Sequence, residues 1–332
     1  MVFSFFFSLS NLLSFMVMIL GILWSLESVG VFGLWIGMEL SFFGVIGILG
    51  SSSIDESECL VKYFVVQVVG SMFVMVFLML ILSGLFEWFV ELVLLVGLSV
   101  KLGLFPFHFW VPSVSSGLSW GGCIVVLIIQ KLIPLWFFVN FCLFGFFLSL
   151  VEFSCMMTCL IGCVGGLMIL HYRVLLSYSS LNHLGFMVIL SIVDVYGLLM
   201  YFIVYFLINV FLMVSLWVMS VYSFFDFLKN KMGSVWVSVY LLSLGGVPPF
   251  LGSFLKVVFL LVCFNFFPLV CVIMLFSSAV GLYFYMTFFL SIYFSLGSVW
   301  DLNLKVVDFL GVISLLVNVV FSLVMFLFVG LM

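Results

Sequence analysis

The chain has 332 residues, of which 68% are hydrophobic and 6% are charged, and its mean hydropathy is +1.59. A soluble domain cannot cover so much apolar surface with so few polar side chains, so the composition excludes a water-soluble globular protein. The net charge of −4 includes no basic tract, which argues against nucleic acid as a partner.

Polar and Gly/Pro clusters divide the sequence into eleven apolar segments, most of them near the roughly 20 residues that cross a bilayer. In lipid the backbone groups must be hydrogen-bonded within the segment, so each is predicted to be a helix. The prediction is an all-α polytopic membrane protein, with a single membrane domain over 1–332. The expected helices cover residues 3–23, 28–50, 60–83, 87–110, 118–138, 146–170, 177–193, 196–220, 235–265, 268–294 and 306–330.

The first of these segments follows no positively charged start and is too long for a signal-peptide core, so we expect a membrane helix rather than a cleaved leader. An Arg- and Ser-rich transit peptide is also not visible. Phe occurs 45 times and Ala once, a bias typical of the G- and T-rich coding strands of small organellar genomes. If the protein is mitochondrial, we expect it to be made inside the organelle.

Positive charges are distributed unevenly between the two predicted sets of loops. The loops on the side of the N-terminus carry five of them and the opposite loops carry none, which places the N-terminus in the cytoplasm or mitochondrial matrix and the C-terminus opposite. The five residues are Lys62, Arg173, Lys229, Lys231 and Lys305.

Two predicted helices contain breakers next to a lysine. In SVKLGLFPFHFWVPSV, Lys101 precedes Pro106, whereas in GGVPPFLG the prolines Pro248 and Pro249 precede Lys256. Paired, interrupted helices in two halves of a transporter indicate an inverted repeat with a polar pathway at its interface. We therefore expect an antiporter-like repeat of residues 1–140 and 146–294 with two broken helices, followed by an additional helix at 306–330.

Four charged side chains lie deep within the predicted helices: Glu39, Lys101, Lys131 and Lys256. Glu39 is about eleven residues into its helix, which corresponds to a depth of roughly 16 Å. Each such charge costs about 2.5–3.5 kcal/mol in the membrane centre. An ion pair that only holds helices together would explain Glu39 and one lysine, but not the other two. We therefore predict that the four residues form a proton relay, since burial makes it easier for a lysine to release its proton.

Other polar residues are weaker candidates. His183, about a turn and a half inside the helix predicted for 177–193, is a secondary candidate for a relay or gate, although a structural hydrogen-bonded histidine explains it equally well. Cys155, Cys159 and Cys163 form a stripe that suits apolar packing better than a soft-metal site. We expect a solvated loop at Asp55, Glu56 and Glu58, and interhelical hydrogen bonds from Gln67, Asn182 and Asn209.

Six segments, in this order, resemble the NADH-ubiquinone oxidoreductase chain 2 family, whose members are mitochondrially encoded, proton-pumping membrane subunits of respiratory complex I related to cation/proton antiporter subunits. The segments are LWIGMELSFF around Glu39, KYFVVQVVGSM at 62–72, VKLGLFPFHFWVPSVSSGLSW at 100–120, IIQKLIP at 128–134, RVLLSYSSLNHLGFM at 173–187 and LSLGGVPPFLGSFLK at 242–256.

The resemblance implies roles for the buried charges: Glu39 and Lys101 would be the acid–lysine pair, Lys131 the central relay lysine and Lys256 the lysine of the second broken helix. It also implies that this chain acts within an H⁺-translocating NADH:ubiquinone reductase and binds no cofactor itself. NADH, FMN, iron–sulfur clusters and ubiquinone would belong to other subunits. Its expected partners are other complex I membrane subunits, especially neighbouring antiporter-like ones, together with membrane lipids and protons. The expected location is the mitochondrial inner membrane, with the N-terminus in the matrix and the C-terminus in the intermembrane space.

Two other functions remain open at this point. The same lysines and repeat would suit a stand-alone cation/proton antiporter, which would be stable alone and exchange ions for protons. A purely structural membrane subunit would use the charges only to orient helices, and would tolerate replacement of Lys131.

Overall fold

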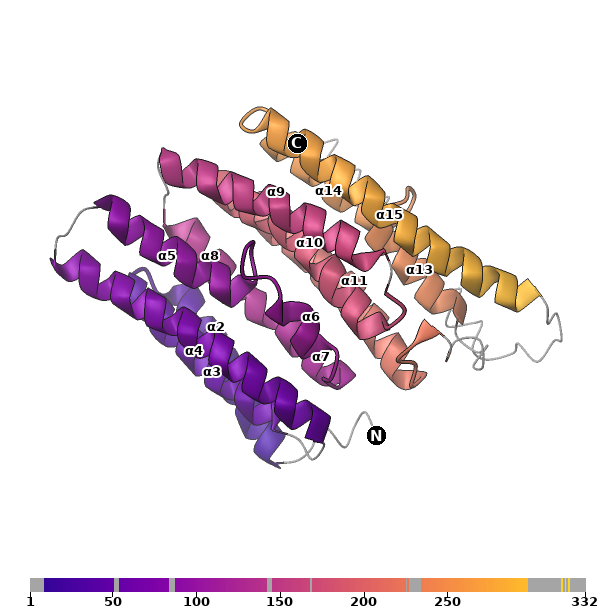
Figure 1. The fold of residues 1–332 in the computed structure, drawn as a ribbon, viewed down its shortest axis with the longest axis horizontal. Helices are drawn as coiled ribbons and strands as arrows, with labels where there is room; N and C mark the ends of the chain where they lie inside the picture. Colours follow the sequence, from indigo (N-terminus) through magenta and orange to yellow (C-terminus); the bar gives the residue numbers. More distant parts are fainter. Residues whose placement is uncertain are drawn as a thin grey trace.

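The computed structural model describes residues 9–50, 54–83, 87–141, 145–167, 169–224, 226 and 234–297, with the single residues 318, 320 and 322. Over these ranges the chain is a bundle of helices that run along one common direction (Figure 1). The described elements are all helices, and one isolated β-bridge joins His171 to Ser223. The helices confirm the predicted all-α fold.

The bundle contains long helices and short ones. Its first part comprises α2 Leu9–Glu27, α3 Val31–Leu49, α4 Ile54–Ser83, α5 Glu87–Leu102, α6 Trp110–Ser115, α7 Trp120–Leu127, the 3₁₀ turn η1 Ile129–Lys131 and α8 Leu132–Asn140. Its second part comprises α9 Phe146–Gly166, α10 Tyr172–Val193, α11 Val195–Val218, α13 Ser234–Gly245, α14 Leu251–Cys263 and α15 Pro268–Gly297.

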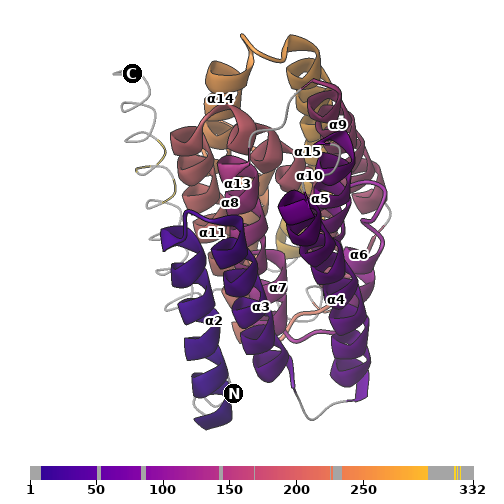
Figure 2. The same cartoon turned by 90° about the vertical axis from the view of Figure 1, so that its left-hand side faces the viewer.

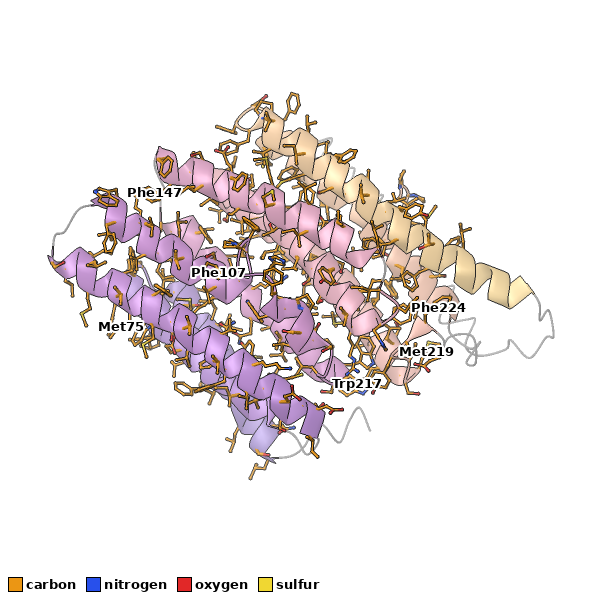
Figure 3. The ribbon with its side chains drawn as sticks, in the orientation of Figure 1. Met75, Phe107, Phe147, Trp217, Met219 and Phe224 are labelled. Atoms are coloured by element: carbon orange, nitrogen blue, oxygen red, sulfur yellow. The ribbon has the colours of Figure 1, made fainter. Side chains whose placement is uncertain are left out.

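Eight helical units within the described ranges are long and apolar enough to cross a membrane, with Trp120–Asn140 counted as one unit. The helix α5 and the pair α13 and α14 are shorter because each meets a predicted break. Large apolar side chains project from the outer faces of the bundle along its length, as expected for surfaces in contact with lipid (Figure 3). The predicted helix at 306–330 lies outside the described residues, apart from the three single positions.

Two helix starts lie earlier than predicted. The helix α4 begins at Ile54, so Asp55, Glu56 and Glu58 belong to the helix rather than to a loop; acids suit a helix N-terminus because the backbone dipole is positive there. The helix α10 begins at Tyr172 rather than 177. Its first turn tolerates Arg173 because the guanidinium donates a hydrogen bond to the carbonyl of Leu118 at the end of the bundle.

The first break follows Lys101. Gly103 adopts a φ of +79°, and the amides of Gly103 and Leu104 both donate to the carbonyl of Ser99 at 2.9 Å. A left-handed glycine of this kind closes a helix C-terminus without a steric penalty. Pro106 lies in the connection that follows, as predicted, and α6 begins at Trp110.

The second break separates α13 from α14. Gly246 has a φ of +73°, and its amide donates to the carbonyl of Ser243 at 3.0 Å. Pro248 and Pro249 fill the connection, so the segment predicted as one interrupted helix at 235–265 is two helices in the structure. Lys256 lies in the second of them.

A third interruption was not predicted. The segment 118–138 was expected to be one continuous helix, but α7 ends at Leu127 and a 3₁₀ turn ending at Lys131 connects it to α8. Pro134 provides the physical reason, since it lacks an N–H and would clash with the carbonyl four residues earlier inside a continuous helix. In the structure it lies in the first turn of α8, where its N–H is not needed.

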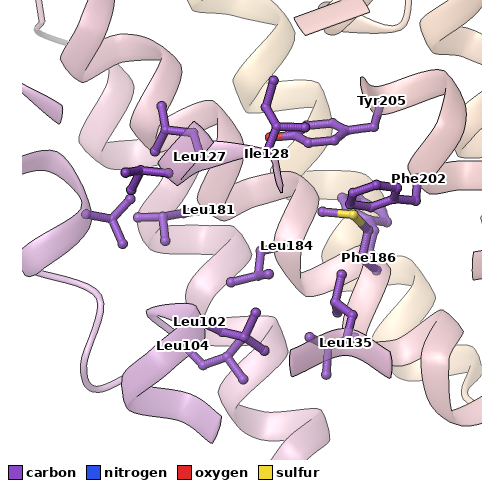
Figure 4. Packing of buried hydrophobic residues seen from close by; sticks show 14 of the residues in the cluster. Leu102, Leu104, Leu127, Ile128, Leu135, Leu181, Leu184, Phe186, Phe202 and Tyr205 are labelled. Carbon is purple, nitrogen blue, oxygen red and sulfur yellow. The ribbon is translucent and has the colours of Figure 1, made fainter. Parts of the chain in front are cut away.

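The centre of the bundle is α10, which buries 17 of its 22 residues, whereas α2 buries only Met18, Gly21 and Ser25. Figure 2 shows α2 at one edge of the bundle and α10 within it. Around α10 the apolar side chains of Leu184 and Phe186 pack with Leu135 of α8 and Leu102 of α5 (Figure 4). The apolar core therefore surrounds the ends of the interrupted helices.

Small residues bring α2 and α3 into close contact. A Cβ added at Gly44 would lie 2.6 Å from the backbone nitrogen of Met18, and one at Gly21 would lie 2.5 Å from the backbone nitrogen of Ser41. Close backbone approach of this kind is a major source of helix association in membranes, where apolar side chains gain little by leaving lipid.

Replacing one of these glycines should therefore weaken the helix pair. We expect Gly44→Ala to lower the unfolding free energy of the detergent-solubilised protein by about 1–3 kcal/mol, because the two backbones must separate. Gly30→Ala is the matched control, since a Cβ there has no heavy atom within 4 Å. Equal stability of the two variants would contradict the close-contact explanation.

Candidate functional site

The predicted acid–lysine pair is formed within the bundle. The Nζ of Lys101 donates a hydrogen bond to Oε1 of Glu39 at 3.0 Å, and the two side chains are 4% and 19% exposed. Gly70 of α4 makes this possible, because a Cβ there would lie 2.6 Å from Cγ of Lys101. The side chains of Glu39 in α3 and Lys101 in α5 can therefore meet, because α4 has a glycine where the Lys101 side chain passes it.

A small cavity of about 20 Å³ lies between Lys101 and Lys131, and both lysines line it. The other polar lining residues are Ser41, Gln67 and Gln130. A cavity of roughly 10–15 Å³ holds a water molecule when polar groups surround it, so this one has room for a water between the two lysines.

Lys131 lies at the end of the 3₁₀ turn and is 4% exposed. Its Nζ donates to the carbonyl oxygen of Ser180 in α10 at 2.7 Å and lies 6.0 Å from the centroid of the Tyr205 ring. Within the described ranges no carboxylate forms an ion pair with it. The interrupted helix places the ammonium against backbone and an aromatic ring, both of which stabilise a cation only partly.

Lys256 uses the second break directly. Its Nζ donates to the carbonyl oxygen of Gly245, the last residue of α13, at 2.7 Å. The last carbonyls of a helix have no partner within the helix and carry partial negative charge, so a cation is favoured there. Gly246 leaves the space, because a Cβ there would lie 2.8 Å from Nζ of Lys256.

His183 lies nearer the membrane centre than the sequence indicated. It was placed a turn and a half inside a helix starting at 177, but α10 starts at Tyr172, which makes His183 the twelfth of 22 residues. Its Nδ1 is 2.8 Å from the hydroxyl of Tyr201, and Nε2 has no hydrogen-bond partner among the described residues. The ring centroid is 5.3 Å from that of Tyr205, whose ring also lies 6.0 Å from Nζ of Lys131.

The structure thus brings three of the four predicted relay residues together. Glu39 contacts Lys101, and a polar cavity joins Lys101 to Lys131, whereas Lys256 lies against the end of α13. His183 and Lys131 both lie beside the ring of Tyr205. Each lysine also lies at an interruption: Lys101 at the end of α5, Lys131 between α7 and α8, and Lys256 against the end of α13. The arrangement can hold protons at several buried positions in succession.

Several contributors were missed by the sequence analysis. Gln67 and Trp110 donate to the carbonyls of Lys101 and Val100 at 3.3 and 3.0 Å, which satisfies the end of α5. Gln130 donates to the carbonyl of Ser41 at 3.3 Å. The predicted interhelical hydrogen bond of Gln67 is therefore confirmed, but its partner at the end of α5 was not predicted. A signal was present, since Gln67 and Gly70 lie one turn apart on α4 and so share a face with room for a polar chain.

The remaining candidates stay apart from the predicted relay residues. Cys155, Cys159 and Cys163 are buried in α9, and Sγ of Cys159 lies 3.2 Å from the carbonyl of Asn182, which suits packing against α10. Over the described ranges no three His, Cys, Asp or Glu side chains converge in a way that would hold a metal ion.

Comparison with known proteins gives a consistent class. The family model described as NADH:quinone oxidoreductase/Mrp antiporter, TM, matches residues 28–283. A chain in the structure of respiratory complex I from Thermus thermophilus with bound aureothin superposes with a TM-score of 0.80, at 19% identity, over 96% of this chain and 80% of that one. A chain of the Mrp complex from Dietzia gives a TM-score of 0.65 at 16% identity, over 83% and 58% of the two chains. The fold and site define an antiporter-like membrane protein.

Curated relatives are more specific. NADH-ubiquinone oxidoreductase chain 2 of Mytilus edulis is 34% identical over 85% of this chain and 86% of its own length. The protein of the same name in Lumbricus terrestris is 31% identical over 84% and 85% of the two chains. The chain therefore belongs to the NADH:quinone oxidoreductase/Mrp antiporter membrane family and, within it, to the NADH-ubiquinone oxidoreductase chain 2 family.

Because Glu39 and Lys101 form an ion pair within the bundle, the losses of unfolding free energy on replacing either residue should depend on the other. Glu39→Gln leaves the ammonium of Lys101 without its counter-ion, so we expect the unfolding free energy of the solubilised protein to fall by about 3 kcal/mol. Lys101→Met alone should cost a similar amount, because it leaves the carboxylate. The double variant should cost clearly less than the sum, since no isolated charge remains.

The control for this cycle is the exposed pair of Glu58 and Lys62, whose charged atoms are 2.6 Å apart. Glu58→Gln should leave stability nearly unchanged, because solvent screens an exposed pair. Strictly additive losses at Glu39 and Lys101 would show that the two groups do not interact in the folded protein.

Proposed function

We propose that this chain is a core membrane subunit of a proton-pumping NADH:ubiquinone oxidoreductase and that it relays protons through Glu39, Lys101, Lys131 and Lys256. The observation that carries the proposal is the set of three lysines at three helix interruptions, of which Lys101 and Lys131 are buried and Lys256 is half-buried. An ion pair lies at the first of them and a polar cavity between the first two. An ion pair alone would account for Lys101, but among the described residues the ammonium groups of Lys131 and Lys256 donate to the backbone carbonyls of Ser180 and Gly245.

The proposed relay uses the balance of forces on each lysine. A buried ammonium is costly and is stabilised by a nearby carboxylate or carbonyl, so moving that partner decides whether the lysine keeps its proton. When Glu39 contacts Lys101 it holds the proton there. When they separate, Lys101 passes the proton to water in the cavity, and neutral Lys131 accepts it from that water.

His183 is the proposed link to the second half of the relay. Its Nδ1 is occupied by Tyr201, while Nε2 is left to accept or donate a proton through water. The alternative, a structural histidine that only anchors α11 through Tyr201, remains compatible with the hydrogen bond. Lys256 at the end of α13 is the last member of the relay.

We also propose where the cofactors and partners lie, by analogy with the family. We place NADH, FMN, the iron–sulfur clusters and ubiquinone in other subunits, with neighbouring antiporter-like subunits and lipids as direct partners of this chain. We further propose the mitochondrial inner membrane as the location, with the N-terminus in the matrix and the C-terminus in the intermembrane space. The residues 1–140 and 146–294 are proposed as inverted repeats, since each contains a helix that stops at a left-handed glycine beside a lysine.

Replacing the central lysine tests the relay. In the assembled enzyme, Lys131→Met should lower the proton-to-electron ratio clearly, because an apolar side chain of similar length cannot carry a proton; Lys101→Met should do the same. Proton uptake and NADH oxidation are measured together in proteoliposomes. Glu27→Gln is the control, since that carboxylate is exposed at the end of α2 and does not line the cavity between Lys101 and Lys131.

A wild-type proton-to-electron ratio in a correctly assembled Lys131→Met enzyme would contradict the relay and favour a structural role for the charges.

A stand-alone cation/proton antiporter is the second candidate, favoured by the match to the Mrp antiporter family and the fold shared with the Dietzia complex. Purification separates the two functions. A subunit of the oxidoreductase should migrate only within a very large complex, whereas a free antiporter should be stable alone and exchange Na⁺ or K⁺ for protons in liposomes.

A further inference from the structure

An open cavity of about 530 Å³ lies at the end of the bundle where α4 and α10 begin. Charged side chains of both signs line it, among them Glu56, Glu58, Lys62 and Arg173. Two of these groups are held in place: Oε1 of Glu56 accepts from the amide of Ser119 at 3.0 Å, and the Arg173 guanidinium lies 4.8 Å from the centroid of the Tyr222 ring. We call this cavity the outer vestibule, because its charged walls suit bulk water.

One face of α4 connects the outer vestibule with the cavity between Lys101 and Lys131. Cys59, Tyr63 and Gln67 follow one another at four-residue spacing, so they lie on the same side of the helix. All three are buried. Cys59 lines the outer vestibule, and Gln67 lines the cavity between Lys101 and Lys131, which we call the inner cavity. Tyr63 therefore lies between the two cavities.

Aromatic rings pack around Tyr63 between the outer vestibule and the inner cavity. Its ring centroid is 5.9 Å from that of Phe42 in α3 and 6.0 Å from that of Trp110 in α6, and both of these residues line the inner cavity. The side chain is fully buried. A tyrosine in a helix leans toward the preceding turn, which here is the turn of Cys59 and the vestibule.

The hydroxyl of Tyr63 has no hydrogen-bond partner among the described residues. A buried hydroxyl without a partner is unfavourable, and a phenylalanine would fill the same apolar space at no such cost. Phe42, which lies against the Tyr63 ring, is one turn from Glu39 on α3, and Lys101 lines the inner cavity. Packing alone therefore does not explain why the ring carries an oxygen.

We propose that Tyr63 is the gate through which protons pass from the outer vestibule to the Glu39–Lys101 pair. The inference rests on the proposed proton translocation and adds its uptake route. The Tyr63 oxygen accepts a proton from a protonated water (H₃O⁺) on the vestibule side, which is left as neutral water, while its own O–H proton passes to a water on the other side. That water, now protonated, gives its proton to the Glu39 carboxylate. The phenol is thus neutral before and after, and rotation about the C–O bond resets it. The aromatic ring blocks continuous water when no proton is passing.

The test uses the assembled enzyme in proteoliposomes. Tyr63→Phe keeps the ring but removes the oxygen, so the proton-to-electron ratio should fall by the same amount as in Lys101→Met, while the passive proton leak stays unchanged. Tyr63→Ala removes the ring as well, so the passive leak should rise several-fold. Tyr172→Phe is the matched control, because Tyr172 is equally buried and packs on Phe288, but lies on α10 and not on the α4 face between Cys59 and Gln67.

The outcomes separate this inference from the proposed function. If Lys101→Met lowers the ratio but Tyr63→Phe keeps it at the wild-type value, the gate is wrong and the relay stands. If neither variant lowers the ratio, the relay itself is wrong. Loss of assembly in Tyr63→Phe would also overturn the gate, because the hydroxyl would then be needed for folding and not for proton transfer.

Discussion

The structure depends on one constraint: within the membrane, every backbone carbonyl and every charge needs a partner that is not bulk water. Where a helix stops inside the bundle, its last carbonyls lose their partners, and the chain supplies side chains for them. Gln67 and Trp110 serve the end of α5, while Lys256 serves the end of α13. The helix interruptions and the buried cations therefore stabilise each other, and neither would be favourable alone.

This mutual dependence explains how the described helices hold three lysines with an ion pair at one of them. Glu39 pairs with Lys101, and the ammonium groups of Lys131 and Lys256 donate to the carbonyls of Ser180 and Gly245. A carbonyl attracts a cation less strongly than a carboxylate does, so small movements change the balance at Lys131 and Lys256.

The sequence predicted the helices, two of the interruptions and the four buried charges, because these depend on local composition. It did not predict the interruption at Lys131, although Pro134 was the available signal. It also missed how space is made for the lysines, since Gly70 and Gly246 act on side chains that come from other helices or from across a break. Similarly, Tyr63 gains its meaning only from the two cavities on either side, which no linear pattern records.

The 3₁₀ turn before α8 has a mechanical consequence. A 3₁₀ turn rises about 2.0 Å per residue and an α-helix about 1.5 Å, so converting Ile129–Lys131 from one form to the other changes the length of the segment by about 1.5 Å. A difference of that size exceeds what the 2.7 Å contact between Lys131 and Ser180 tolerates. The three-residue turn therefore fixes how far along the bundle axis the Lys131 ammonium lies, independently of α7 and α8.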